Sequence, residues 1–159
     1  MTDTAFPTTG YLAWQLSRNI AVSLERELRE LDLTLAQYNA LLHTLRTPGI
    51  TSADIARRSQ ITAQSMGAAV NQLIERGLLR REPHPTSRRS MRLFVTEEGR
   101  AACARADAVS SRITAGATGH FSPEDRAALH HLLYRLVEEL NPELLAPAGP
   151  QALPGREQN

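Results

Sequence analysis

Lysine is missing from this chain of 159 residues, because all 18 of its basic residues are arginine. The single cysteine, Cys103, excludes an internal disulfide bond and is consistent with a reducing compartment. No apolar run approaches the length needed to cross a bilayer, and the N-terminus lacks the basic and apolar stretches of a signal peptide. These absences predict a cytoplasmic protein that does not contact a membrane.

Signatures of catalysis and of cofactor binding are missing as well. The chain has no Gly-rich phosphate loop, no Cys/His cluster and no pair of carboxylates in a recognisable setting. Its five histidines do not follow the spacing of a metal site, and the adjacent His130 and His131 point in different directions on a helix. We therefore expect no enzymatic activity, no catalytic residue, no cofactor and no metal ion.

Charge is distributed unevenly along the chain, although the net charge is only +1. Between Thr51 and Arg92 there are eight arginines and three carboxylates, a net of +5, so the remainder carries −4. This asymmetry predicts one module that faces a polyanion and another that faces something else. Arginine suits both phosphate and guanine, because its guanidinium donates two parallel hydrogen bonds.

Two short helices joined by a tight turn are expected within the basic region. Thr51 with Asp54 predicts the start of a helix that runs through Arg58, and Thr62 is a good N-cap for a second helix that ends near Arg76. Gly77 follows where a left-handed C-cap residue is wanted. This is a helix-turn-helix pattern. The first turn of the second helix carries Ala63, Gln64 and Ser65, and we expect Gln64 and Ser65 to contact base edges and Thr62 to contact phosphate.

A β-hairpin is predicted directly after the second helix. Residues 78–82 form one strand, 83–90 a polar loop, and 91–95 a second strand in which Met91, Leu93 and Val95 alternate with Arg92 and Phe94. A hairpin in this position is a wing.

Long amphipathic helices flank the wing and the helix-turn-helix. Apolar residues recur at helical spacing from Thr9 or Gly10 to Leu31, after Thr96, and again after Ser122-Pro123 up to Leu140. They carry more apolar surface than a small winged domain can cover, which predicts a homodimer. The expected fold is mainly α with a small β-hairpin wing. Residues 1–32 and 97–141 form dimerisation arms, 33–96 a winged helix-turn-helix module and 142–159 a flexible tail.

Five segments carry the residues at the junctions between elements: Leu33–Tyr38, Ala53–Ala56, Leu73–Arg81, Arg88–Arg89 and Leu93–Arg100. Together they resemble the multiple-antibiotic-resistance regulator (MarR) family of winged-helix transcription factors, over about residues 10–141. One position departs from that family, which usually has an Asp before the Arg pair of the wing to brace an arginine. Here Ser87 occupies that place, so the brace would be a weaker hydrogen bond or would come from elsewhere.

The resemblance implies a DNA-binding transcriptional regulator, expected to be a repressor. Arg89 would enter the minor groove, and Arg88 would contact phosphate or share that role. Arg57 and Arg76 are expected either to contact the DNA backbone or to pair with nearby carboxylates. Two recognition helices roughly 34 Å apart would read a pseudo-palindromic operator in double-stranded DNA.

The resemblance also implies a small phenolic or aromatic effector that binds where the arms meet the winged module. The candidate lining residues are Tyr11, Trp14, Arg18, Tyr38 and His43. Cys103 could sense oxidants, but its mid-helix position beside small residues favours a buried structural role. Two alternatives stay open: a winged helix that contacts only proteins, and a repressor without a ligand.

Overall fold

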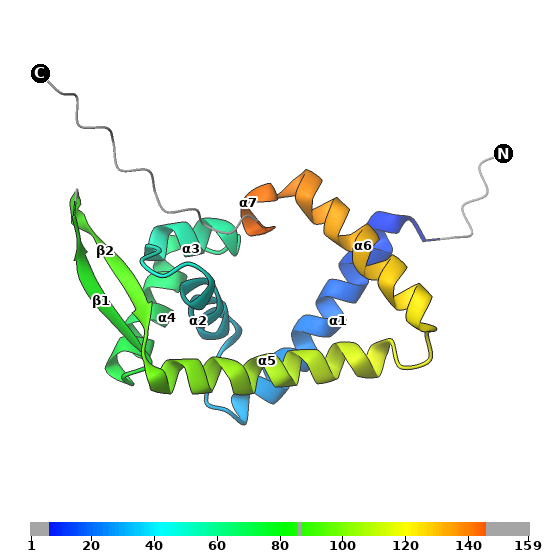
Figure 1. The fold of residues 1–159 in the computed structure, drawn as a ribbon, viewed down its shortest axis with the longest axis horizontal. Helices are drawn as coiled ribbons and strands as arrows, with labels where there is room; N and C mark the ends of the chain where they lie inside the picture. The colour runs from blue at the N-terminus through cyan, green and yellow to red at the C-terminus, as the bar shows by residue number, and fades with distance from the viewer. Residues whose placement is uncertain (1–6, 86, 146–159) are drawn as a thin grey trace, which may run out of the picture.

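The architecture is mainly helical, with one two-stranded antiparallel sheet between the fourth and fifth helices (Figure 1). The computed structural model describes residues 7–85 and 87–145. Its elements are α1 (Thr9–Arg29), α2 (Leu35–Arg46), α3 (Ser52–Arg58), α4 (Ala63–Glu75), β1 (Leu79–His84), β2 (Ser87–Val95), α5 (Glu97–Ala117), α6 (Pro123–Leu140) and α7 (Pro142–Leu145). The predicted order of helices and wing strands is confirmed. Within the described ranges, no helix has the length and apolar character that a membrane span requires.

Helix starts are set by hydroxyl side chains at every long helix. Thr34 caps α2 through a complete capping box with Gln37, in which each side chain bonds the other residue's backbone N–H. Thr62 accepts a hydrogen bond from the backbone N–H of Ser65 at the start of α4. The remaining caps follow the same pattern, at Thr8, Thr51, Thr96 and Ser122.

Three helices end in a Schellman motif with a left-handed residue. At the end of α4 that residue is Gly77, with φ +70°, and the N–H of Leu78 reaches the carbonyl of Leu73. The ends of α1 and α3 place Asp32 and Gln60 in the same conformation, with φ of 53° and 54°. Non-glycine residues rarely adopt this conformation, so their strain must be offset by the packing of the following turn.

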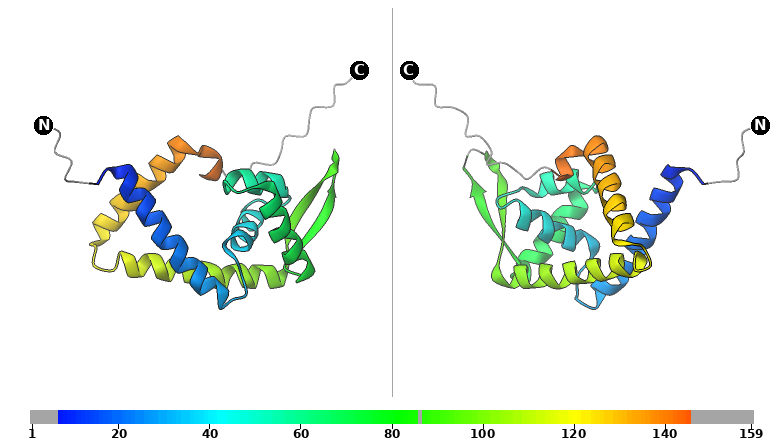
Figure 2. Two further views of the ribbon diagram at one scale, coloured as in Figure 1. Left: turned by 180° about the vertical axis from the view of Figure 1, so that it is seen from behind. Right: turned by 45° about the vertical axis from the view of Figure 1, so that its right-hand side comes forward.

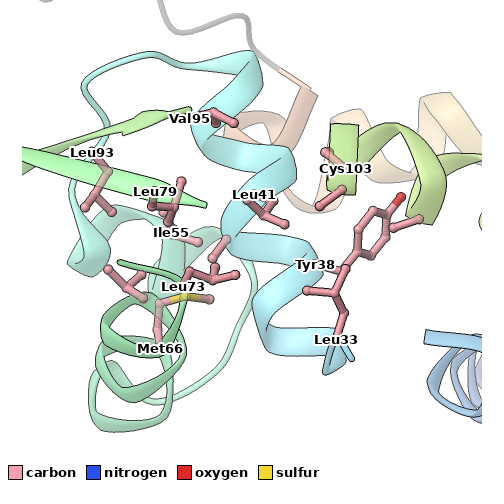
Figure 3. Close-up of a cluster of buried hydrophobic side chains, with 14 of the residues drawn as sticks. Leu33, Tyr38, Leu41, Ile55, Met66, Leu73, Leu79, Leu93, Val95 and Cys103 are labelled. Atoms are coloured by element: carbon pink, nitrogen blue, oxygen red, sulfur yellow. The ribbon is translucent and has the colours of Figure 1, made fainter. Parts of the chain in front are cut away.

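One hydrophobic core joins α1, α2, α3, α4, the wing and the beginning of α5. Figure 3 shows part of it: Leu41 faces Leu73 and Leu79, with Met66 below them. Leu28, Leu41, Ile55, Met66 and Leu73 are completely buried. Burying one such side chain stabilises the fold by about 1.5–3 kcal/mol, so the winged module and the root of α1 are held as one unit.

The wing is longer than predicted. Residues 83–90 were expected to form a loop, yet β1 continues to His84 and β2 begins at Ser87. Pro83 pairs with Met91, and the register becomes irregular between Pro83 and His84. A proline has no backbone N–H to donate. In a two-stranded sheet its nitrogen can lie on the outer edge of the strand, away from the partner strand, so no hydrogen bond of the sheet is lost. The strands therefore extend almost to the tip.

The arms project away from the winged module on the side opposite the wing (Figures 1 and 2). α5 leads directly from β2 into the arm, and α1 crosses it, with Arg112 Nη2 2.9 Å from Glu27 Oε2. α6 contains no buried residue. Residues 142–145, the first part of the predicted flexible tail, form α7, and the rest of that segment lies outside the described residues.

Candidate nucleic-acid interface

The exposed end of α4 is the centre of the candidate interface. Thr62, Ala63, Gln64 and Ser65 are all exposed, while Met66 begins the buried face of the helix. The hydroxyl of Thr62 donates a hydrogen bond of 2.8 Å to Ser65 Oγ, in addition to its capping role. The three predicted contact residues Thr62, Gln64 and Ser65 are therefore together on one solvent-facing turn. A helix N-terminus of this kind presents unpaired N–H groups, which favour negative charge such as phosphate.

The arginines predicted on α3 and α4 already have partners within the chain. Arg57 Nη1 lies 3.0 Å from Asp54 Oδ1 across one turn of α3, with more than half of the Arg57 side chain exposed. Arg76 Nη1 donates a 2.5 Å hydrogen bond to the backbone carbonyl of Asp32. An exposed ion pair contributes about 0–1 kcal/mol, so loss of the Asp54 contact alone would cost little. Arg76 is tied to the end of α1 instead.

Arg88 and Arg89 are the second and third residues of β2. Their side chains and that of Ser87 are outside what the structure describes. The base of the wing, which the structure does describe, carries a separate group of contacts. The Phe94 ring makes cation–π contacts with two guanidinium groups, with Arg80 Cζ 4.6 Å and Arg92 Cζ 5.0 Å from its centroid.

An ion pair reinforces this base, because Arg80 also pairs with Glu82 on the same strand. Sequence reasoning did not identify these contacts. Arg80, Glu82, Arg92 and Phe94 lie on one face of the paired strands, and this alternation was the available signal.

A cavity of about 280 Å³ lies between α3, α4 and the wing. Val70, Ile74, Met91 and Leu93 supply apolar lining. The polar lining includes the exposed side chain of Arg81. The arrangement suits a small amphiphilic anion, since one guanidinium can hold a carboxylate beside an apolar wall. Nothing in the sequence pattern indicated this cavity, because its walls come from elements that meet only in the fold.

The residues predicted to line an effector site fall into two groups. Tyr11, Trp14 and Arg18 form an exposed cluster on α1, with ring centroids 6.1 Å apart and Arg18 Cζ 5.9 Å from the Trp14 centroid. Tyr38 and His43 are instead buried on α2. Tyr38 hydrogen-bonds Asp107 on α5. Burial, and then the charges of Arg58 and Arg46, lower the pKa of His43 below its ordinary value.

Cys103 is completely buried in α5. Burial, and then the charge of Asp107, raise its pKa to about 11, which keeps the thiol protonated at neutral pH. Among the described residues, no group of three or more His, Cys, Asp or Glu side chains could hold a metal ion.

The fold and the exposed α4 end define a winged-helix protein with the geometry of a DNA-binding module. Residues 31–90 match the profile of the MarR family. The chain is 32% identical to the HTH-type transcriptional repressor Rv2887 of Mycobacterium tuberculosis over 100 residues, which are 63% of this chain and 72% of that protein. This chain belongs to the MarR family, a family of transcriptional regulators and not of enzymes.

Solved structures agree with this assignment. A crystal structure of MarR superposes with a TM-score of 0.76 at 30% identity, covering 88% of this chain and 95% of that one. The Rv2887 protein of Mycobacterium tuberculosis in complex with salicylic acid superposes with a TM-score of 0.70 at 26% identity, covering 83% of this chain and 98% of that one. The same relative has also been crystallised in complex with DNA.

Proposed function

We propose that this protein is a transcriptional repressor that binds a pseudo-palindromic DNA operator as a homodimer. The observation that carries the proposal is the exposed first turn of α4. The other face of α4 is buried in the core, so this turn is held in place near the basic hairpin. Gln64 and Ser65 read base edges in the major groove, and Arg88 and Arg89 contact the minor groove and the adjacent phosphates. A relative that binds DNA, Rv2887, supports this function.

The homodimer follows from apolar side chains that the single chain leaves uncovered. On α6 the exposed fractions are 56% for Leu132, 49% for Leu136 and 82% for Leu140, and on α1 the value for Trp14 is 56%. Isolated exposed apolar residues are ordinary, but a series of them along two helices of the arms supports an interface. A second copy offers the same two faces, so an isologous contact can cover both. We propose residues 1–32 and 97–141 as the dimerisation arms and residues 33–96 as the DNA-binding module.

Selection of bound duplexes from a random pool tests the function directly. We expect a two-fold-symmetric consensus with half-sites one helical turn apart. If the dimer makes roughly 6–10 phosphate contacts, its affinity falls about 10³–10⁵-fold between 50 and 200 mM salt. Arg88→Ala with Arg89→Ala should weaken binding. Arg29→Ala with Arg105→Ala, which removes the same charge outside the module, should not. No enriched duplex would favour the alternative of a winged helix that contacts only proteins.

The dimer has its own test. Leu136→Glu places a charge on the exposed face of α6, and we expect a monomer in sedimentation velocity together with loss of operator binding. Glu138→Gln changes the charge of the same helix without placing one on an apolar position, and it should remain dimeric. A wild-type protein that is monomeric at micromolar concentration would overturn the proposal.

We propose further that a small aromatic acid releases the repressor from DNA, as suggested by the salicylic acid complex of Rv2887. We take as candidate sites two guanidinium groups that lie beside apolar surface, Arg18 on α1 and Arg81 in the cavity behind α4. Salicylate should lower operator affinity by about 5–150-fold. The site is identified by whether Arg18→Ala or Arg81→Ala abolishes the effect of salicylate on operator affinity. Arg26→Ala on α1 is the control. An unchanged affinity across a panel of aromatic acids would favour a ligand-independent repressor.

A further inference from the structure

The C-terminal half of α4 is joined to the beginning of α2 by a pair of glutamines. Gln37 Nε2 donates a hydrogen bond of 2.8 Å to Gln72 Oε1, although the residues are 35 positions apart. Gln37 is only 5% exposed, and its Oε1 accepts the backbone N–H of Thr34 in the capping box. That bond fixes the orientation of the amide, because only the oxygen can accept it, so the NH₂ group must face Gln72.

A second contact joins the same half of α4 to the end of α1. Arg76 lies one turn after Gln72, so both side chains project from one side of the helix. Its Nη1 bonds the carbonyl of Asp32, 44 positions earlier, in the Schellman turn where Leu33 N–H reaches the carbonyl of Leu28. Leu28 and Leu33 are both buried, so this turn is a firm anchor.

These two bonds attach the recognition helix at the end that does not contact bases. Gln64 precedes Gln72 by eight residues, which is about 12 Å along a helix. A tilt of about 10° at the anchored end therefore moves the base-contacting end by about 2 Å, enough to break a hydrogen bond to a base. The Gln37–Gln72 bond fixes the tilt of α4 relative to α2 of the module, and the Arg76–Asp32 bond fixes it relative to the end of α1 in the arm.

We propose that Gln72 and Arg76 are positioning residues that set the inclination of α4 relative to the dimerisation arm, and thereby select the spacing of the two DNA half-sites. This inference rests on the proposed operator-binding dimer. It also gives Arg76 a role different from a phosphate contact, since its guanidinium is directed at the Asp32 carbonyl.

The test measures affinity for the selected duplex and for versions with one base pair added or removed between the half-sites. One base pair changes the separation by about 3.4 Å and rotates one half-site by about 34° relative to the other. We expect the wild-type protein to lose at least about tenfold in affinity on either change. Gln72→Leu combined with Arg76→Met should reduce that loss to within about threefold, because α4 is then held by its buried face alone and its tilt is less constrained.

Conservative variants distinguish a positioning role of Gln72 and Arg76 from a direct contact of the Arg76 charge with DNA. Gln72→Glu keeps an acceptor for Gln37, and Arg76→Lys keeps a donor and the charge, so both should retain the wild-type spacing preference. Glu75→Gln, at a neighbouring exposed position of α4, should retain it too. A phosphate contact by Arg76 would instead weaken binding to all three duplexes equally in Arg76→Met, and the slope of log affinity against log salt would fall by about two, one for each protomer.

The outcomes are distinct for the two proposals. If the wild-type protein selects no symmetric duplex, the proposed function itself is wrong. If the wild-type protein discriminates among the three spacings and the Leu/Met double variant does so equally well, the repressor stands and the positioning role is wrong. Both positions are exposed, and thermal unfolding of each variant verifies that the fold is retained.

Discussion

The phenolic hydroxyl of Tyr38 donates a hydrogen bond of 2.5 Å to Asp107 Oδ1 and so joins α2 of the winged module to α5 of the arm. The Tyr38 side chain is only 6% exposed, and a carboxylate is a strong acceptor for a buried hydroxyl. Burial, and then the hydrogen bond and charge of Asp107, raise the pKa of Tyr38 above its ordinary value. This hydrogen bond is a polar link between the winged module and the arm.

Tyr38→Phe removes this bond while keeping the ring. Because the acceptor is charged, we expect the free energy of unfolding to fall by about 1.5–3 kcal/mol, measured by urea denaturation. Tyr134→Phe on the exposed α6 is the control and should change it by less than about 0.5 kcal/mol. In the Asp107→Ala background, Tyr38→Phe should cost much less, since the two positions share one interaction. Equal costs in both backgrounds would show that the bond contributes nothing.

The lowered pKa of His43 predicts how the free energy of unfolding depends on pH. Its pKa is lowered in the folded chain by burial and then by Arg58 and Arg46, whereas the unfolded chain binds the proton at the ordinary value of 6.5. Below about pH 6.5 the unfolded state therefore binds more protons, and stability declines as the pH falls. We expect His43→Gln to show a smaller decline between pH 7.5 and 5.5 in urea midpoints. His131→Gln, at an exposed position of α6, should decline like the wild type.

Helix boundaries could be predicted because their causes are local in sequence. Thr34, Thr62 and Ser122 cap helices through bonds to residues three positions later, and each pattern is visible in a short window. Gly77 ends α4 for a reason equally local. The exposed turn at Gln64 was likewise predicted from the Thr62 cap and the residues that follow it, and the family resemblance added the minor-groove role of Arg89.

Contacts between distant residues could not be predicted in the same way. Arg76 looks like any arginine at the end of a helix, and nothing nearby indicates that its partner is the carbonyl of Asp32. The burial of Gln37 and Thr44 among leucines also contradicts a reading of α2 by polarity alone. The length of the wing was underestimated because Pro83 was taken as the end of a strand. Arg76 and Gln37 have partners in elements distant in sequence, and the length of β1 depends on its pairing with the next strand.

Two glycines of α5, Gly99 and Gly116, should differ sharply in how substitution by alanine changes stability. A β-carbon added at Gly99 would lie 2.0 Å from the backbone carbonyl oxygen of Leu78 and 2.8 Å from Val95 Cγ1, whereas one at Gly116 would meet nothing within 4 Å. Gly99→Ala must therefore push α5 away from the wing, and we expect a loss of about 1–3 kcal/mol. Gly116→Ala should be neutral or stabilising by up to about 1 kcal/mol, because alanine favours helix. Thermal unfolding of the two variants makes the comparison, and equal midpoints would contradict it.

Cys103 predicts that peroxide does not control DNA binding. With a pKa of about 11, only about one thiol in a thousand is ionised at pH 8, and the thiolate is the reactive form. The side chain is also completely buried, so an oxidant reaches it only when the fold opens. A thiol-reactive dye should therefore label the native protein slowly and the urea-unfolded protein at the rate of a free thiol.

Hydrogen peroxide at a concentration that oxidises an exposed cysteine should leave operator affinity unchanged in both the wild type and Cys103→Ala. A peroxide response that is present in the wild type and absent in Cys103→Ala would show instead that α5 opens often enough for the thiol to be oxidised. Such opening would separate Cys103 from Tyr38 and Asp107, because all three lie at the junction of α2 and α5. Tyr38→Phe, which loosens that junction, should then accelerate dye labelling, so the labelling rate connects the redox behaviour of Cys103 with the bond that joins module and arm.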